Sequence, residues 1–465
     1  MQLEQLIDEL RTRFGAAAVL TGSDVSARPA GWRGPPSEAA AIVRPANTAE
    51  VAEVLRLCHA AGLPVVTHGG RTGVVGGAVS GPGEIALSLE RLTAIEEVDV
   101  ANRTLTVQAG VPLQLVQERA DAEGLLFPQD LGARGSATIG GMVATNAGGN
   151  RVIRFGMMRD MVLGLEAVLA DGTVVSSLHK VIKNNSGYDL RQLFVGSEGT
   201  LGVVTRVVLR LRPKPRSQNT ALLAVPDFAA VTRLLSELEA GLGGQLSVFE
   251  VMWNAYYALS APTAWQGRAA PLAAGSSAFY ALVEALGGDA DGDAERFAQV
   301  LAAAHAKGLV GEAVIARSEQ ERQNLWAVRD NVECLHELDP VFLFDVSLPI
   351  GDMHGYVDEL EQQLGARWPD HQLVVFGHLG DCNLHVVVAV GDGSETARGL
   401  VEEVIYGGIE RRGGSISAEH GIGIEKRDHL HHSRSPAELA LMRALKSTLD
   451  PRGILNPGKV LAPTG

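Results

Sequence analysis

Cysteine is scarce in this sequence: the 465 residues include three, Cys58, Cys334 and Cys382, widely spaced and in no C-x-x-C pair. An odd number without paired spacing excludes a disulfide framework and an iron–sulfur cluster, and it is typical of a reducing compartment. Since no run of about 18 apolar residues occurs, the sequence predicts no transmembrane helix. The first residues also lack the positive start and apolar stretch of a signal peptide. We therefore expect a cytoplasmic protein.

Positive charge is also in short supply. Lysine and arginine number 40 against 54 aspartates and glutamates, which gives a formal net charge of -14. Because phosphate backbones are bound by basic surfaces, this balance argues against a nucleic-acid partner. The content of 46% hydrophobic and 20% charged residues is that of a globular protein. A chain of this length exceeds one hydrophobic core, so we expect two or three domains.

Strand and helix patterns divide the chain. The first half alternates strands with helices, among them a helix over 49–60 capped by Thr48 and one that begins at Pro112. Strand patterns occur at 63–66, 85–89, 104–109, 162–169 and 203–211.

The prolines of Arg210–Arg216 suit an extended linker. Three strand–helix–strand passes follow, up to residue 376, and they predict an antiparallel sheet with helices on one side. The predicted fold class is α+β, with a two-part FAD-binding domain at 1–215, a substrate (cap) domain at 216–415 and a helical segment at 416–465 that returns to the flavin site.

Three glycine-rich segments, at 66–77, 128–149 and 196–204, underlie the prediction of a nucleotide cofactor. Adjacent glycines allow backbone N–H groups to converge on an anion such as a pyrophosphate. The first segment, VTHGGRTGVVGG, taken alone fits a tight surface turn equally well. The other two add hydroxyl groups that can bond a ribityl chain or a phosphate.

Together with Arg154-Phe-Gly156 and Lys183–Leu190, these segments resemble the FAD-binding domain of the vanillyl-alcohol oxidase/para-cresol methylhydroxylase flavoproteins over residues 40–212. The resemblance implies FAD as cofactor. Some members attach FAD covalently to a histidine, but we interpret His68 as a polar side chain beside a phosphate turn and expect non-covalent FAD. The resemblance implies these cofactor-binding residues: Gly69, Gly70, Arg71, Thr72, Gly73, Gly76, Gln129, Thr138, Gly140, Gly141, Asn146, Gly148, Gly149, Glu198, Gly199, Gly202, Val204 and Asn456.

A set of histidines marks the second half. His378 and His385 stand at the ends of two apolar strands joined by a Gly-Asp-Cys-Asn turn, and Glu419 and His420 lie between small residues. Any one of these histidines alone suits a structural role. Two histidines and a carboxylate that leave coordination positions open form a competent site for a divalent ion such as zinc.

The motifs H-x-G-D-x-N-x-H and S-x-x-E-H-G resemble those of the metal-dependent D-2-hydroxyacid dehydrogenases of this flavoprotein family, which include D-lactate and D-2-hydroxyglutarate dehydrogenases. This resemblance implies metal ligands at His378, His385 and Glu419, binding zinc or manganese, and a catalytic base at His420. Arg329, in Trp326-Ala-Val-Arg329, matches the arginine that grips the substrate carboxylate, a task suited to a planar guanidinium.

Three pocket positions depart from the D-2-hydroxyglutarate enzymes. Leu343 stands where those enzymes carry Lys, Val387 where they carry Asn, and Glu333 where they carry Ser or Thr. Losing a cation and gaining an anion is unfavourable for a second substrate carboxylate. The sequence therefore favours a D-2-hydroxy acid with an uncharged side chain, as in lactate or mandelate, over D-2-hydroxyglutarate or D-malate.

The predicted reaction is oxidation of the hydroxy acid to a 2-keto acid, with hydride passed to FAD and electrons then passed to an external acceptor. That acceptor is an electron-transferring flavoprotein, a quinone or a cytochrome, since no dinucleotide fingerprint for NAD follows any strand. A homodimer is the state that the resemblance implies. Two alternatives stay open: a metal-free flavin alcohol oxidase, and a flavin subunit of a glycolate-oxidase-like complex, which would have no need of the Glu419–His420 pair.

Overall fold

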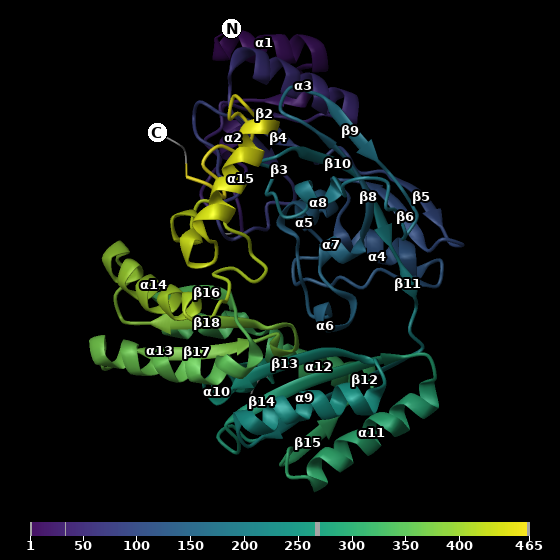
Figure 1. Cartoon of the computed structure of the whole chain (residues 1–465), viewed down its shortest axis with the longest axis vertical. Helices are drawn as coiled ribbons and strands as arrows, with labels where there is room; N and C mark the ends of the chain where they lie inside the picture. Colours follow the sequence, from purple (N-terminus) through teal and green to yellow (C-terminus); the bar gives the residue numbers. More distant parts are fainter. Residues whose placement is uncertain (1, 33, 266–269, 463–465) are drawn as a thin grey trace. The chain divides into compact units, whose positions relative to one another are not determined.

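The computed structural model describes residues 2–32, 34–265 and 270–462, and it forms two compact units (Figure 1). Among the residues so described, no helix is both long and apolar enough to cross a membrane.

Both units are discontinuous in sequence. Unit 1 combines residues 1–149, 156–214 and 419–465, and unit 2 combines residues 150–155 and 215–418. The short segment 150–155 therefore belongs to unit 2, although the residues on both sides of it belong to unit 1.

Unit 1 contains a small sheet of four strands. Their order is β1 (Val19–Leu20), β2 (Ala41–Val43), β4 (Ile85–Ser88) and β3 (Val65–His68). Strands β2, β4 and β3 run parallel, and apolar residues of helices α1 (Leu3–Phe14) and α3 (Thr48–Ala61) join them in one core. This part of the unit places β3 and the loop that follows it.

Two predicted helix starts needed correction. The cap of α3 is Asn47, whose side chain accepts from the backbone N–H of Glu50, and not Thr48, whose hydroxyl donates to Glu166 at 2.6 Å. Asn and Thr both satisfy the free N–H groups at a helix start, so the pattern alone does not separate neighbours. Pro112 is likewise the cap residue of α4 (Leu113–Asp121), which begins one residue later than predicted.

The second sheet of unit 1 is antiparallel. Its strand order is β5 (Ile95–Asp99), β6 (Thr104–Gln108), β10 (Val203–Arg210), β8 (Val162–Val168) and β9 (Val174–Ser177). Helix α5 (Ile139–Thr145) contacts β10 and β6. The strand patterns predicted at 85–89, 104–109, 162–169 and 203–211 are confirmed, each ending one residue earlier.

The residues after 419 complete unit 1. Helix α15 (Pro436–Leu449) starts with a capping box between Ser435 and Glu438. The Lys446 ammonium donates to the carbonyls of Thr200 and Leu455, and Leu455 forms a parallel bridge with Val65 of β3. This segment is thus joined to the rest of unit 1 by the Lys446 side chain and by a backbone bridge.

Unit 2 is built on an antiparallel sheet of seven strands. Their order is β15 (Glu312–Ile315), β12 (Ser217–Val225), β14 (Phe279–Gly287), β13 (Leu246–Trp253), β17 (Gln372–Gly377), β18 (Asn383–Ala389) and β16 (Val341–Ser347). The three predicted passes of strand, helix and strand are all present.

Helices cover both faces of this sheet, so the predicted one-sided cover is wrong. Phe228 of α9 (Phe228–Leu242) packs on the rings of Trp253 and Phe279. On the opposite face, Tyr256 of α10 (Asn254–Ala264) stacks on Phe376, and α12 (Glu319–Asp330) contacts β12 and β14. Every residue of β14 is buried, which requires cover on both sides.

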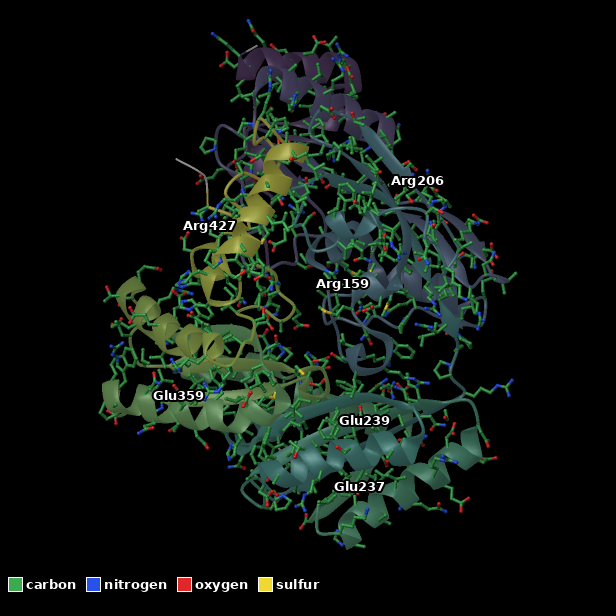
Figure 2. All side chains as sticks on the ribbon, in the orientation of Figure 1. Arg159, Arg206, Glu237, Glu239, Glu359 and Arg427 are labelled. Atoms are coloured by element: carbon green, nitrogen blue, oxygen red, sulfur yellow. The ribbon has the colours of Figure 1, made fainter. Side chains whose placement is uncertain are left out.

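Unit 2 also contains the helices α6 (Val152–Phe155), α11 (Ala290–Ala306), α13 (Met353–Arg367) and α14 (Glu395–Glu410). Helices α13 and α14 pack together, and Glu359 of α13, labelled in Figure 2, pairs with Arg411 and Arg412 at the end of α14. These ion pairs lie at the periphery of unit 2. The residues that bear on chemistry lie on the opposite face of the sheet, which α10 and α12 cover.

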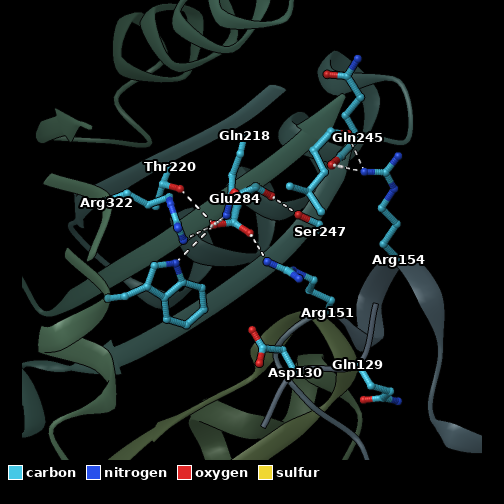
Figure 3. A network of polar contacts seen from close by, with 12 residues as sticks. Gln129, Asp130, Arg151, Arg154, Gln218, Thr220, Gln245, Ser247, Glu284 and Arg322 are labelled. Carbon is cyan, nitrogen blue, oxygen red and sulfur yellow. Dashed lines mark hydrogen bonds and ion pairs between the residues drawn. The ribbon is translucent and has the colours of Figure 1, made fainter. Parts of the chain in front are cut away.

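The segment 150–155 is anchored to the sheet of unit 2 through arginines (Figure 3). Arg151 contacts the buried carboxylate of Glu284 on β14 at 3.3 Å, and Arg154 donates to the carbonyls of Gln245 and Leu286. Gln218 also donates to Glu284, at 2.8 Å. Because a buried carboxylate without partners is costly, this set of donors makes Glu284 a fixed anchor.

Candidate active site

Unit 1 contains a pocket at the glycine-rich segments. Its wall begins at the end of β3, continues along the start of α5, and includes Glu419 and His420. The residues predicted to bind cofactor that line it are Gly69, Gly70, Arg71, Thr72, Gly73, Thr138, Gly140, Gly141, Gly148, Glu198, Gly199, Gly202, Val204 and Asn456.

Glycine is required in this wall where backbones approach closely. A Cβ atom on Gly70 would lie 2.0 Å from the Ser136 carbonyl oxygen, and one on Gly140 would lie 2.6 Å from the Cβ of Ala109. The segments can therefore lie against one another only because their side chains are absent.

Four residues predicted to bind cofactor lie outside the pocket lining. A Cβ on Gly76 would strike Ile424, and one on Gly149 would strike the Asp130 carbonyl oxygen. Gln129 is buried and donates to the Ala147 carbonyl at 3.2 Å, while Asn146 ends α5 in the left-handed region. These four residues support the wall from behind.

His68 is placed away from the lining as well. Its Nε2 lies 3.0 Å from the Ser80 hydroxyl, and its side chain is buried. Burial, aided by the positive charge of Arg71, lowers the pKa of His68 to about 4, so the imidazole is neutral near pH 7. The geometry is that of a polar residue inside the turn.

Glu198 holds the segment after Glu419 against this pocket. Its carboxylate oxygens accept from the backbone N–H groups of Ile422 and Gly423 at 2.7 and 2.8 Å. Burial raises the pKa of Glu198 above its ordinary value, against the lowering effect of these two hydrogen bonds. Asn456 in turn donates to the Glu198 carbonyl at 2.6 Å and accepts from Thr67 N–H at 2.8 Å.

His420 lies beside Glu419 in the same wall, with its Nε2 3.5 Å from a carboxylate oxygen of Glu419. Its side chain is 38% exposed, which leaves the imidazole open to the pocket. A histidine with this access can exchange protons with a bound molecule.

In unit 2, a buried cluster forms around Glu250 of β13. One carboxylate oxygen is 2.5 Å from Nδ1 of His378, and the other accepts from Nε of Arg329 at 2.6 Å. Burial would raise the pKa of Glu250, but the charges of Arg329 and His378 outweigh it and lower the pKa to about 2. Glu250 is therefore an ionised carboxylate in the interior.

His385 lies next to this cluster. Its ring centroid is 5.4 Å from that of His378, and the Phe376 ring lies near both His385 and the Arg329 guanidinium, at 5.0 and 4.9 Å. The predicted pair of histidines is thus brought together. His385 is the third residue of β18, however, rather than at a strand end, and the 3-10 turn Leu379–Asp381 supplies the change of direction after His378.

Asp345 of β16 stands opposite His385 in the sheet register. A carboxylate oxygen of Asp345 lies within 4.8 Å of a ring nitrogen of His385. The same carboxylate accepts from Asn383 at 2.7 Å and from the backbone N–H of Ala418 at 3.1 Å. Asp345 therefore fixes the residue that directly precedes Glu419 in the chain.

The three pocket positions that depart from the D-2-hydroxyglutarate enzymes also lie in unit 2. Leu343 and Val387 are register partners on β16 and β18, on the same face as Asp345 and His385. Leu343 is 59% exposed and Val387 is buried. Glu333 is exposed on the 3-10 helix Val332–Leu338 and pairs with His336 at 3.4 Å.

Comparisons with known proteins agree with these features. Residues 39–177 match the family model of the FAD binding domain, and residues 214–460 match that of the FAD linked oxidases, C-terminal domain. The chain is 42% identical to D-2-hydroxyglutarate dehydrogenase of Bos taurus, with 90% of this chain and 76% of that protein covered. It is 41% identical to D-2-hydroxyglutarate dehydrogenase of Xanthomonas citri pv. viticola, with 90% and 89% covered.

The chain belongs to the FAD-linked oxidase family. Among solved structures, p-cresol methylhydroxylase with substrate bound superposes with a TM-score of 0.73, at 16% identity, over 99% of this chain and 97% of that one. The predicted α+β fold of the vanillyl-alcohol oxidase type is therefore confirmed, and the protein is an FAD-dependent oxidoreductase.

The pocket of this family member fits a flavin nucleotide. The hydroxyls of Thr67 and Thr138 are buried in its wall and have no hydrogen-bond partner among the residues that the structure describes. Buried hydroxyl groups are normally bonded, so they are placed to bond a polar ligand. Apolar residues such as Val204 and Met142 line the rest of the pocket, as suits an aromatic ring system.

Sequence reasoning missed Glu250 and Asp345. Both are carboxylates inside otherwise apolar strands, in Ser247–Met252 and Phe342–Leu348. A charged residue is rarely fully buried unless paired, so this exception in an apolar strand was the available signal. The partner of Glu250 is His378 and that of Asp345 is His385. Each partner is far away in the sequence, and only the strand register brings the two members of each pair together.

Proposed function

We propose that this FAD-linked oxidase is a metal-dependent dehydrogenase that oxidises a D-2-hydroxy acid to the 2-keto acid. The observation that carries the proposal is the cluster of Arg329, His378 and His385 on one face of the unit 2 sheet. A guanidinium beside two imidazoles suits a substrate whose carboxylate is bound next to a metal-chelated hydroxyl.

The donor set fits a divalent cation. Nδ1 of His378 contacts the Glu250 carboxylate at 2.5 Å, so Nε2 is the ring nitrogen that would coordinate a metal. His385 would supply a second nitrogen. Glu419, which directly follows Ala418 in the chain, would supply a carboxylate oxygen. Two nitrogen donors and a carboxylate suit zinc or manganese. A bound ion would supply Lewis acidity that lowers the pKa of the substrate hydroxyl.

The residues of the chain divide the remaining work. Arg329 binds and orients the substrate carboxylate, and His420 takes the proton of the hydroxyl as general base. FAD bound non-covalently in the unit 1 pocket would supply hydride-accepting chemistry, and the electrons would then pass to an external acceptor such as an electron-transferring flavoprotein, a quinone or a cytochrome. The placement of His420 in the wall of the FAD pocket supports this role.

The substrate side chain is proposed to be uncharged, as in D-lactate or D-mandelate. Leu343 and Val387 form an apolar pair on the face that carries His385. Glu333, which the resemblance assigns to the same pocket, carries a negative charge. A second carboxylate beside these residues would lose its hydration without gaining a cationic partner.

A second candidate substrate is D-2-hydroxyglutarate. It is favoured by the names of relatives that are 42% and 41% identical to this chain. The two candidates differ in the charge of the distal group, so one experiment separates them.

The test is anaerobic bleaching of the flavin by D- and L-lactate, D-mandelate and D-2-hydroxyglutarate, with and without EDTA. We expect D-lactate or D-mandelate to bleach fastest and EDTA to abolish bleaching. Bleaching unaffected by EDTA and by added Zn²⁺ or Mn²⁺ would favour a metal-free oxidase. Faster bleaching by D-2-hydroxyglutarate would establish the second candidate.

A variant tests the base. His420→Asn is expected to keep bound FAD and to lose turnover by at least about 100-fold, the usual contribution of a general base. Full turnover in this variant would contradict the assignment. The absence of dye-linked turnover in the purified wild-type chain would point to the flavin-subunit alternative.

A further inference from the structure

Two buried carboxylates in the sheet of unit 2 are paired with arginines. Glu250 lies on β13 and Glu284 on the neighbouring strand β14, each with 0% exposure. Glu250 is opposite Leu282 in the register, two residues from Glu284 on the same strand, so the two carboxylates share one face. Helix α12 covers this face and supplies Arg322 to Glu284 and Arg329 to Glu250.

The partners of Glu284 give it a structural role and no role in the proposed reaction. It accepts from Gln218, Thr220 and Trp326, and it pairs with Arg151 (Figure 3). These donors come from β12, α12 and the segment 150–155. Glu284 therefore ties three pieces of unit 2 together.

Glu250 differs because its two oxygens contact two functional side chains of the proposed reaction. One oxygen is 2.5 Å from Nδ1 of His378, and the other accepts from Nε of Arg329 at 2.6 Å. An ionised carboxylate accepts hydrogen bonds only, so the proton of a neutral His378 must lie on Nδ1. The tautomer with a bare Nε2 is the one that coordinates a metal through that atom.

The same contact directs Arg329. With Nε bound to Glu250, one terminal nitrogen of the guanidinium, Nη2, lies 3.5 Å from Nε2 of His378. Tyr256 donates to the Arg329 backbone carbonyl at 2.8 Å, and Phe376 lies under the guanidinium. Arg329 is thereby held at its Nε, at the face of its guanidinium and at its backbone carbonyl, with Nη2 beside Nε2 of His378.

We propose that Glu250 is a positioning residue that sets the tautomer of His378 and the direction of Arg329 with one carboxylate. The inference rests on the proposed function, since it takes His378 as a metal ligand and Arg329 as the carboxylate-binding residue. It assigns to one buried group the relative placement of the ion and the substrate carboxylate. Arg329 belongs to α12 and His378 follows the last residue of β17, so the Glu250 carboxylate joins side chains from two different elements.

The first test is the tautomer of His378 in the wild-type protein. Nitrogen-15 labelling of histidine gives imidazole shifts that distinguish Nδ1–H from Nε2–H, and the signal missing in His378→Asn identifies the residue. We expect Nδ1–H in the metal-free holoprotein with FAD bound. A proton on Nε2 would overturn the inference, whatever the variants do.

The second test is Glu250→Gln, whose amide offers one acceptor and one donor in place of two acceptors. We expect the affinity for Zn²⁺, titrated alone into the metal-free holoprotein, to fall about 10- to 100-fold. KM for the hydroxy acid is expected to rise as well. Glu250→Asp, which keeps both acceptors but is shorter, is expected to recover part of the Zn²⁺ affinity.

Glu284→Gln is the matched control, since it removes an equally buried charge from the same face. It is expected to lower the melting temperature while leaving Zn²⁺ affinity and kcat/KM at wild-type values. Unchanged Zn²⁺ affinity in Glu250→Gln, or an equal loss in Glu284→Gln, would overturn the inference. If the wild-type protein with Nδ1–H on His378 binds no Zn²⁺ or Mn²⁺, the proposed function itself fails, which is a distinguishable result.

Discussion

The role of single site residues in this protein depends on partners that are distant in sequence. His378 stood out by its motif, but its Nδ1 contacts Glu250, which lies 128 residues earlier and belongs to no motif. Asp345 was missed for the same reason, because strand register alone brings it opposite His385. Motif residues could be predicted from the sequence, whereas the carboxylates that orient them could not.

His68 provides a pH prediction at this scale. Its pKa is about 4 in the folded protein, against 6.5 for a free imidazole, so the unfolded chain binds more protons between these values. The free energy of unfolding should therefore decrease as pH falls from 6.5 to 4, by about 3 kcal/mol from this residue.

Denaturant unfolding of His68→Gln, measured across this range, checks the prediction. The variant should show a smaller decrease than the wild type, and His431→Gln, at an exposed position, should match the wild type. Parallel pH curves for wild type and His68→Gln would contradict the assignment of a buried neutral imidazole.

Leu343 and Val387 provide a specificity prediction. The double variant Leu343→Lys, Val387→Asn introduces a cation and an amide on the face that carries His385. Because a charge-assisted hydrogen bond contributes about 1.5–3 kcal/mol, kcat/KM for D-2-hydroxyglutarate relative to D-lactate should rise about 10- to 100-fold. Leu343→Met with Val387 unchanged is the control. An unchanged ratio in the double variant would remove these residues from the substrate pocket.

At the scale of elements, the sequence was informative about which segments form and less so about their ends and surroundings. The seven-stranded sheet follows the three predicted passes, because apolar runs with turn residues between them are local signals. The cap at Asn47 and the cover on both faces of β14 depend on competition between neighbouring residues and on packing. Those features arise only when distant elements meet.

The glycine segments give a prediction at this scale. Gly70→Ala would place a Cβ 2.0 Å from the Ser136 carbonyl, so the two segments must move apart. We expect a loss of a few kcal/mol of unfolding free energy, and purified protein with little FAD.

Gly83→Ala is the control for this substitution. A Cβ on Gly83 meets no atom within 4 Å, and the residue does not line the pocket. Absorbance at 450 nm relative to 280 nm measures the FAD content of both variants. A normal FAD content in Gly70→Ala would show that the wall tolerates the wider spacing.

At the scale of the whole molecule, unit 1 is closed by residues that come after unit 2 in the chain. Asn456 bonds Thr67 of β3 and the carbonyl of Glu198, and Leu455 bridges Val65. The predicted linear division at 215 and 416 gave no reason to place residues 150–155 with the sheet of unit 2. Only the arginine contacts to Glu284, Gln245 and Leu286 give that reason.

Asn456→Ala tests this closure. It leaves the Thr67 N–H and the Glu198 carbonyl without a partner, at a cost of about 1–3 kcal/mol for each buried group. The Kd for FAD, measured by fluorescence titration of apoprotein, should rise at least about tenfold. Asn47→Ala removes a helix cap elsewhere in unit 1, and it should lower the melting temperature without changing the Kd.

The bond between Asn456 and Thr67 spans 389 residues, and this separation has a consequence for biosynthesis. The residues that form the wall of the FAD pocket are synthesised in two separate parts of the chain, and nearly all of unit 2 is synthesised between them. A nascent chain that has completed β3 and the three glycine segments still lacks Asn456 and the residues that Glu198 binds. Cofactor capture is therefore a late event, and a ribosome that stalls within unit 2 releases a chain that cannot close its FAD pocket.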